Sequence, residues 1–233
     1  MYTYLLLNIL TVLVPFLFSF EKKIAYAAKW KALFPAMALT AAFFLAWDHY
    51  FTAAGVWGFT ESYLVNIYAG HLPLEEILFF FCIPYSCVFI YEALSVSAKS
   101  RASRPWAPFL ALLAVLLVAC AVANTGRIYT LTVCLITAAF LLAHVVFLKF
   151  RPMGIFHAAF GISLVPFLIV NGILTRGIRA ISAAPVVWYD PAAILNLRIG
   201  TVPLEDFLYS YLLIFMNVTW YEFFKRKFRS EER

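Results

Sequence analysis

Two short acidic motifs are the strongest candidates for chemistry. Residues 73–76 read Pro-Leu-Glu-Glu, and residues 203–206 read Pro-Leu-Glu-Asp. We call the separation along the chain between positions 73 and 203 the repeat offset, because other residues recur at the same separation. Each motif precedes an apolar stretch. A carboxyl group in a dry setting, close to other carboxyls, keeps its proton more readily than in water and can serve as a general acid. The candidate catalytic residues are therefore Glu75, Glu76, Glu205 and Asp206.

A structural interpretation of these motifs competes with the catalytic one. Proline suits the first turn of a helix, and carboxylates there face the positive end of the helix dipole. Two copies at presumed membrane boundaries favour function, because ionisable groups in or near a bilayer are costly. Neighbouring helical residues point about 100° apart. One acid of each pair should therefore face a cavity, and the other a neighbouring helix or the lipid headgroups.

Asp48 is a fifth candidate acid. It ends another apolar stretch, and the repeat offset places Ile178 at its position, so it is not duplicated. Aromatic and amide residues surround the acids, either as an interfacial belt or as the wall of a pocket. Aromatic faces attract cations best where water is absent. Dry acids and aromatic walls together suit a reaction that protonates an alkene and guides a carbocation. The candidate substrate-binding residues are Trp47, Trp57, Phe59, Asn66, Phe79, Phe80, Trp188, Tyr189, Asn196 and Tyr209.

The elements that position these residues are membrane helices. Hydrophobic residues make up 64% of the 233 residues and charged residues 13%, against about 25% charged in soluble domains. A span needs about 20 mostly apolar residues. The sequence predicts an all-α polytopic membrane protein with seven spans, at Tyr4–Phe20, Ala32–Phe51, Ile77–Leu94, Ala107–Ala123, Ile128–Leu148, Ile155–Thr175 and Phe207–Phe224.

The repeated motifs also predict the domain organisation. The repeat offset carries Tyr91-Glu92 onto Tyr221-Glu222 as well. We expect one repeat at residues 1–95, a connector with the fourth span at 96–127, and a second repeat with a basic tail at 128–233. An even number of crossings between equivalent spans gives the repeats the same orientation, related by an axis along the membrane normal. The pocket between them is the expected site.

Charge predicts the orientation in the membrane. The connections after spans 1, 3 and 5 and the C-terminal tail hold 14 of the 18 basic residues. Basic residues in short loops mark the cytoplasmic side. We expect the C-terminus in the cytoplasm and the N-terminus outside, in the cell (inner) membrane. Glu92 and Glu222 fall at the cytoplasmic ends of spans 3 and 7, and we interpret them as ion-paired, with Lys225 or Arg226 in reach of Glu222.

The paired motifs, together with the stretches 47–49 (Trp-Asp-His) and 57–59 (Trp-Gly-Phe), resemble the lycopene β-cyclase family of the non-flavin, heterodimeric or fused type. The resemblance covers nearly the whole chain. It implies an intramolecular lyase or isomerase of carotenoid biosynthesis, in which a carboxyl protonates the terminal double bond of lycopene and a β-ionone ring closes without redox change.

The implied partners are lycopene or a related acyclic carotenoid, the lipid bilayer and neighbouring carotenoid enzymes, with no nucleic acid. The sequence carries no dinucleotide or metal motif, so we expect no cofactor and no metal. Two alternatives stay open. A carotenoid hydratase would let water capture the same cation, and a membrane transporter would move a substrate without changing it.

Overall fold

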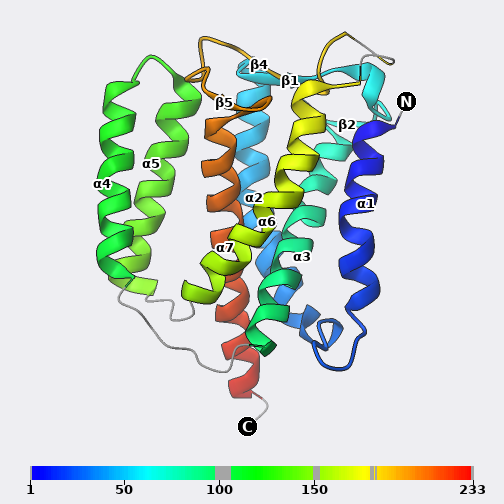
Figure 1. Ribbon diagram of the computed structural model, residues 1–233, viewed down its shortest axis with the longest axis vertical. Coiled ribbons are helices and arrows are strands. Elements are labelled where there is room, and N and C mark those ends of the chain that lie inside the picture. Colours follow the sequence, from blue (N-terminus) through cyan, green and yellow to red (C-terminus); the bar gives the residue numbers. More distant parts are fainter. Residues whose placement is uncertain (1, 98–105, 149–152, 179–180, 182, 232–233) are drawn as a thin grey trace.

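The computed structural model describes residues 2–97, 106–148, 153–178, 181 and 183–231. Seven α-helices occur in these residues and run side by side as one bundle (Figure 1). The start of α1 and the end of α7 lie at opposite ends of this bundle (Figure 1). The helices are α1 (Thr3–Phe18), α2 (Trp30–Ala53), α3 (Leu74–Ser97), α4 (Ala107–Ala123), α5 (Ile128–Ala143), α6 (Met153–Arg176) and α7 (Leu204–Glu231).

The prediction of an all-α protein is confirmed, and several helix ends differ from the ends of the predicted spans. α3 and α7 each begin three residues before the predicted span, directly after Pro73 and Pro203. α5 ends early and continues as a π-helical segment, His144–Leu148. Both motif prolines are thus the last residue before a helix and not part of its first turn. Part of the predicted connector, residues 98–105, lies outside the described residues.

Four helical stretches are long and apolar enough to cross a membrane. They are Ala27–Ala53, Leu74–Ser97, Ile128–Phe147 and Met153–Arg176. α1 and α4 are apolar but shorter. On α4, Val115 and Val122 are 64% and 67% exposed, which fits a helix surface that faces lipid. The helices therefore support a membrane protein, while the crossing of α1, α4 and α7 stays a prediction.

Helices α3 and α7 form the centre of the bundle. α3 contacts α1, α2, α6 and α7, and α7 contacts α2, α3, α5 and α6. α4 packs on α5 at one side of the bundle (Figure 1). The acidic motifs start α3 and α7 at the same end of the bundle. We call this the motif end, and the end that carries the last turns of α7 the tail end.

The loops at the motif end contain short strands, all two or three residues long. β1 (Trp57–Phe59) pairs antiparallel with β4 (Val187–Tyr189). β2 (Tyr68–Ala69) pairs with β3 (Leu72–Pro73), and β5 (Arg198–Ile199) pairs with β6 (Val202–Pro203). The two hairpins lie directly before α3 and α7, so each motif acid pair is placed by a hairpin that leads into its helix.

The pairing of β1 with β4 is centred on Gly58 and Trp188, which are separated by the repeat offset. Two backbone hydrogen bonds flank this pairing: Thr60 N–H donates to the Val186 carbonyl at 2.9 Å, and Asp190 N–H donates to the Val56 carbonyl at 2.8 Å. The two donors, and likewise the two acceptors, are separated by the repeat offset. A Cβ atom on Gly58 would lie 2.3 Å from Cζ2 of Trp188. Only one of these two facing positions can therefore carry a large side chain.

The two hairpins share their local conformation. Asn66 and Asn196 have φ angles of 64° and 61°, and Gly70 and Gly200 have 62° and 64°. These left-handed positions favour glycine and, among other residues, asparagine. Behind each hairpin, the N–H of the first helical residue donates to a loop carbonyl, from Leu74 to Ile67 at 2.8 Å and from Leu204 to Leu197 at 2.9 Å.

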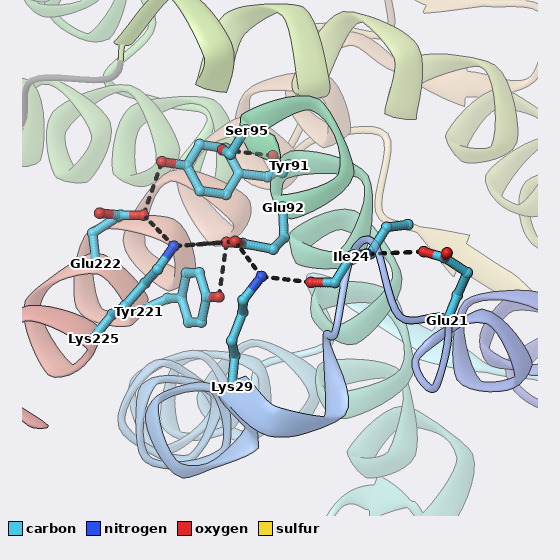
Figure 2. Close-up of polar contacts among 9 residues, drawn as sticks. All are labelled: Glu21, Ile24, Lys29, Tyr91, Glu92, Ser95, Tyr221, Glu222 and Lys225. Atoms are coloured by element: carbon cyan, nitrogen blue, oxygen red, sulfur yellow. Dashed lines mark hydrogen bonds and ion pairs between the residues drawn. The ribbon is translucent and has the colours of Figure 1, made fainter. Parts of the chain in front are cut away.

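At the tail end, Glu92 of α3 lies among cations (Figure 2). Its carboxylate accepts bonds from Lys29 Nζ at 2.7 Å and from Lys225 Nζ at 2.9 Å. The Tyr221 hydroxyl donates to it at 2.8 Å. Glu92 is 2% exposed, so the two lysines supply the positive charge that a buried carboxylate needs.

The counterpart Glu222 of α7 is held in a similar way (Figure 2). It accepts a hydrogen bond from the Tyr91 hydroxyl at 3.1 Å and lies 3.4 Å from Lys225 Nζ. The ion pair predicted between Glu222 and Lys225 is thus confirmed. Because each tyrosine bonds the glutamate of the other helix, the cluster joins α3 to α7.

Candidate functional site

The first acid of each motif is bonded to its own loop. Glu75 Oε1 accepts the N–H of Val65 at 2.6 Å, and Glu205 Oε1 accepts the N–H of Leu195 at 2.7 Å. Both glutamates are almost fully buried. Glu205 also accepts the hydroxyl of Thr130 at 2.5 Å. These acids tie the turn before each hairpin to the start of the helix that follows.

The second acid of each motif faces the interior and meets tyrosines. The Tyr4 hydroxyl donates to Glu76. Asp206 accepts two such bonds, from Tyr129 at 2.9 Å and from Tyr189 at 2.8 Å. The two acids of each motif thus point in different directions, as the helical angle between neighbouring residues requires.

Asp48 joins Glu76 and Asp206 from a third helix. It lies near the end of α2 and is 3% exposed. The Trp57 side chain lines the same chamber as Asp48, and the Oδ2 atom of Asp48 has no hydrogen-bond partner among the described residues. Three carboxyl groups from α2, α3 and α7 therefore meet at the motif end.

These three acids line one small chamber of about 70 Å³. Its described lining contains no lysine, arginine or histidine. Three buried negative charges without a cation would be very costly, so the chamber favours a state in which a carboxyl keeps its proton. The described lining residues are Tyr4, Asp48, Trp57, Phe59, Glu76, Phe79, Ile83, Tyr129, Phe167, Asn171, Leu174, Val187, Tyr189, Asp206, Tyr209, Ser210 and Leu213.

Aromatic rings form much of the chamber wall. The centroid of the Tyr209 ring lies 5.2 Å from Trp47, 6.3 Å from Trp57 and 6.2 Å from Tyr129. The Trp57 and Tyr129 rings meet edge to face at 5.0 Å. Ring faces present negative potential, and this stabilises a nearby cation most strongly where water is excluded.

The loop residue Tyr189 is a hydrogen-bond donor in this wall. Burial, followed by the nearby Asp206 carboxyl, raises the pKa of the Tyr189 hydroxyl well above its ordinary value. The phenol therefore keeps its proton and donates it in the hydrogen bond to Asp206. In this way the strand β4 positions a side chain of α7.

The structure places the predicted substrate-binding residues in two groups. Trp57, Phe59, Phe79, Tyr189 and Tyr209 line the chamber. The remaining five lie outside its lining. Trp47 and Phe80 are buried and pack against Tyr209 from behind, and Trp188 is 41% exposed over Gly58. Asn66 and Asn196 are exposed, in the left-handed turns of their loops.

Sequence reasoning missed Tyr4 and Tyr129, the tyrosines that bond the two motif acids from α1 and α5. The distance along the chain between these tyrosines is shorter than the repeat offset. A search at that single offset could not align them. The signal that could have found them is a tyrosine at the start of both the first and the fifth apolar stretch.

Carboxyl groups can donate or accept a proton and aromatic faces can stabilise a cation, and both line the same small chamber. Among the described residues, no group of three or more His, Cys, Asp and Glu side chains is arranged to hold a metal ion.

Comparison with known proteins adds one finding. A family model described as lycopene cyclase matches residues 1–94 and 126–224 of the chain. The first segment ends after the first acidic motif, and the second segment contains the other. Tyr4 and Tyr129 each lie three residues after the start of a matched segment. No curated protein and no solved structure matches the chain.

Proposed function

The chain belongs to the lycopene cyclase family, and on that premise we propose that it closes the acyclic ψ-ends of lycopene into β-ionone rings. The family match assigns the chain to carotenoid biosynthesis, with an acyclic carotenoid as substrate. The observation that carries the finer proposal is the chamber at the motif end, in which Asp48, Glu76 and Asp206 converge among aromatic rings, with no cation among the described lining residues.

The reaction needs one proton to enter and one to leave. A protonated carboxyl gives its proton to the terminal C=C bond of the substrate, which produces a tertiary carbocation. The next C=C bond attacks this cation and closes the six-membered ring. A carboxylate then removes a proton from a ring carbon and the new C=C bond forms. The product is an isomer of the substrate, so the balance requires no oxidant or reductant.

The hydrogen bonds suggest how the acids share these roles. Asp206 accepts two phenol hydrogens, and such donors stabilise the negative form of a carboxylate. We assign it to balance the cation and to take the ring proton. Asp48 has an unpartnered Oδ2 and Glu76 accepts one tyrosine bond. One of these two carries the proton that starts the reaction.

We also propose the membrane arrangement expected from the sequence. The arrangement has seven crossings, two parallel repeats at 1–95 and 128–233, and a connector at 96–127. It is supported by pairs of hydrogen bonds between the repeats in which donor and acceptor positions correspond at the repeat offset. The start of α1 and the end of α7 lie at opposite ends of the bundle (Figure 1), as an odd number of crossings requires, and the basic residues favour a cytoplasmic C-terminus with an external N-terminus. Reporter fusions at residue 233 and in the loop 124–127 would test this orientation.

Product analysis tests the function. In membranes from a host that makes lycopene, we expect the chain to convert lycopene into γ-carotene and β-carotene without added cofactors. In D₂O, each new ring should gain one deuterium, because the entering proton comes from an exchangeable carboxyl. A hydrated product would identify a hydratase, and unchanged lycopene would contradict the proposal. Movement of a substrate without new products would identify a transporter.

A further inference from the structure

A second cavity lies beside the chamber and is open between helices. We call it the side groove. It has a volume of about 440 Å³ and is formed by α1, α3, α6 and α7. This volume lies in the range of about 300–1,000 Å³ that small-molecule sites occupy. Four residues line both the groove and the chamber: Ile83, Phe167, Asn171 and Ser210. The two cavities therefore adjoin.

The side groove has an apolar lining, and its few hydroxyl groups are already hydrogen-bonded. Its described lining holds no charged side chain. Its hydroxyl groups are bonded to nearby backbone: Ser163 donates to Ala159 at 2.9 Å, and Ser210 donates to Phe207 at 3.0 Å. Ser86 in the same way donates to backbone carbonyls of α1 and α3. An occupant is thus offered hydrocarbon contacts and few free hydrogen-bond donors.

Small side chains make room for the groove on this side of the bundle. Ser86 and Cys87 of α3 line it, and the corresponding positions of α7, one repeat offset later, hold Met216 and Asn217. Ile90 likewise corresponds to Trp220. Where the groove meets the chamber, the smaller side chain is on α7 instead: Ser210 corresponds to the fully buried Phe80 of α3. At Ser86, Cys87 and Ile90, α3 therefore carries smaller side chains on the groove side than α7 carries one repeat offset later.

The rim of the groove is exposed and apolar. Leu10 on α1 is 54% exposed, and Ile169 on α6 is 61% exposed. Both line the groove, and both lie on apolar helices of the bundle. A hydrophobic molecule dissolved in the bilayer could enter between α1 and α6 without crossing a polar surface.

We propose that the side groove holds the polyene chain of the carotenoid while one of its ends occupies the chamber. This inference rests on the proposed function and adds to it the site that recognises the unreacted part of the substrate. The chamber of about 70 Å³ is too small for more than an end of such a molecule. The adjoining groove supplies the apolar continuation, so only one end of the molecule is placed at the acids at a time.

The test fills the groove. Ile90→Trp introduces the side chain that α7 carries at the corresponding position, and Leu164→Trp fills the groove from α6. Ile162→Trp is the matched control, because Ile162 is 49% exposed on the same helix and is not among the groove residues. Each full-length variant is purified and given two substrates: lycopene, and a shortened acyclic polyene that keeps one ψ-end.

We expect both groove variants to cyclise lycopene about tenfold more slowly or worse, since overpacking excludes the chain. The same variants should cyclise the shortened substrate within about twofold of the unchanged protein, because the chamber is intact. The control should match the unchanged protein on both substrates. Normal turnover of lycopene by both groove variants, or equal loss of both substrates in folded variants, would overturn the inference.

Binding separates this inference from the proposed function. Lycopene that copurifies with the unchanged protein is measured by its absorbance and compared with the groove variants. Retention of lycopene by the unchanged protein without cyclisation would refute the function and leave the groove as a binding site if the variants lose it. Failure of the unchanged protein to retain lycopene, or full retention by both groove variants, would refute the groove.

Discussion

The two ends of α3 and α7 carry the same kind of residue in different surroundings. At the tail end, Glu92 and Glu222 lie beside Lys29 and Lys225 (Figure 2). At the motif end, the second acid of each motif is met by tyrosine hydroxyls, in a chamber with no cation among its described lining residues. Both pairs recur at the repeat offset.

Duplication alone therefore cannot identify the acids that we propose to be reactive, because both pairs are duplicated. A buried glutamate beside two lysines is held in its charged form and joins helices. A buried carboxyl bonded only by neutral donors has no cation that fixes its charge, so it can exchange a proton with a substrate. The predictions below test this difference, from the largest expected effect to the smallest.

Removing a chamber acid should have the largest effect. Glu76→Gln and Asp206→Asn keep the size of the side chain but cannot exchange the proton. General acid–base catalysis contributes about 10²–10⁴-fold, so lycopene should accumulate at normal protein levels, as measured by pigment extraction at matched membrane abundance. Asp48→Asn should act in the same range if Asp48 starts the reaction. Wild-type turnover in all three variants would show that the chamber acids do not take part in the reaction.

Loss of the tyrosine donors should have an intermediate effect. Tyr129→Phe or Tyr189→Phe removes one hydrogen bond to Asp206, and bonds to charged groups contribute about 1.5–3 kcal/mol. We expect kcat to fall about 10- to 100-fold for either change, with lycopene binding unchanged. Tyr50→Phe is the control, because Tyr50 is 72% exposed. A fall in lycopene binding with normal kcat would contradict the positioning role.

The first acids of the motifs should affect stability more than chemistry. Glu75→Gln and Glu205→Gln keep an acceptor for the loop N–H groups but lose the charge-assisted bond, at a cost of about 1 kcal/mol. Thermal unfolding of the purified protein should begin at lower temperature, while turnover per folded molecule stays within severalfold. A loss as large as that of Asp206→Asn would show that the first acids take part in the reaction.

The tail-end cluster should show the smallest effect on turnover. Lys29 and Lys225 side chains are 23% and 28% exposed, so water partly screens their pairs with Glu92. We expect Glu92→Gln to lower the stability by about 1 kcal/mol and to leave turnover unchanged. High salt should reduce the difference between this variant and the unchanged protein. Loss of cyclisation in folded Glu92→Gln protein would show that the tail-end glutamate also affects the reaction, contrary to the proposed difference between the two ends.

Much of the fold follows from composition and spacing. Apolar stretches of about 20 residues favour helices in lipid, because a helix satisfies its own backbone hydrogen bonds. Each of the seven predicted segments contains a helix in the structure. The repeat offset likewise indicated that the two motifs share one local structure. The short strands were not predicted, because pieces of two or three residues carry no periodic pattern.

The candidate site was predicted only in part. The five acids and the aromatic residues near them were identified from residue type and position, and Asp48, Glu76 and Asp206 do converge. The choice between the first and the second acid depends on the rotation of each helix about its axis. That rotation is set by the hairpins and by the N–H groups of Val65 and Leu195, which donate hydrogen bonds to Glu75 and Glu205.

The sequence by itself determined the helical class, the apolar surface and the pair of acidic motifs, because each depends on residues that are close along the chain. Only the tertiary structure decided which groups share the chamber and where the side groove opens. Tyr4 and Glu76 are 72 residues apart, and Tyr129 and Asp206 are 77 residues apart. Such contacts depend on how the helices pack, and packing follows the shapes of side chains on several helices at once.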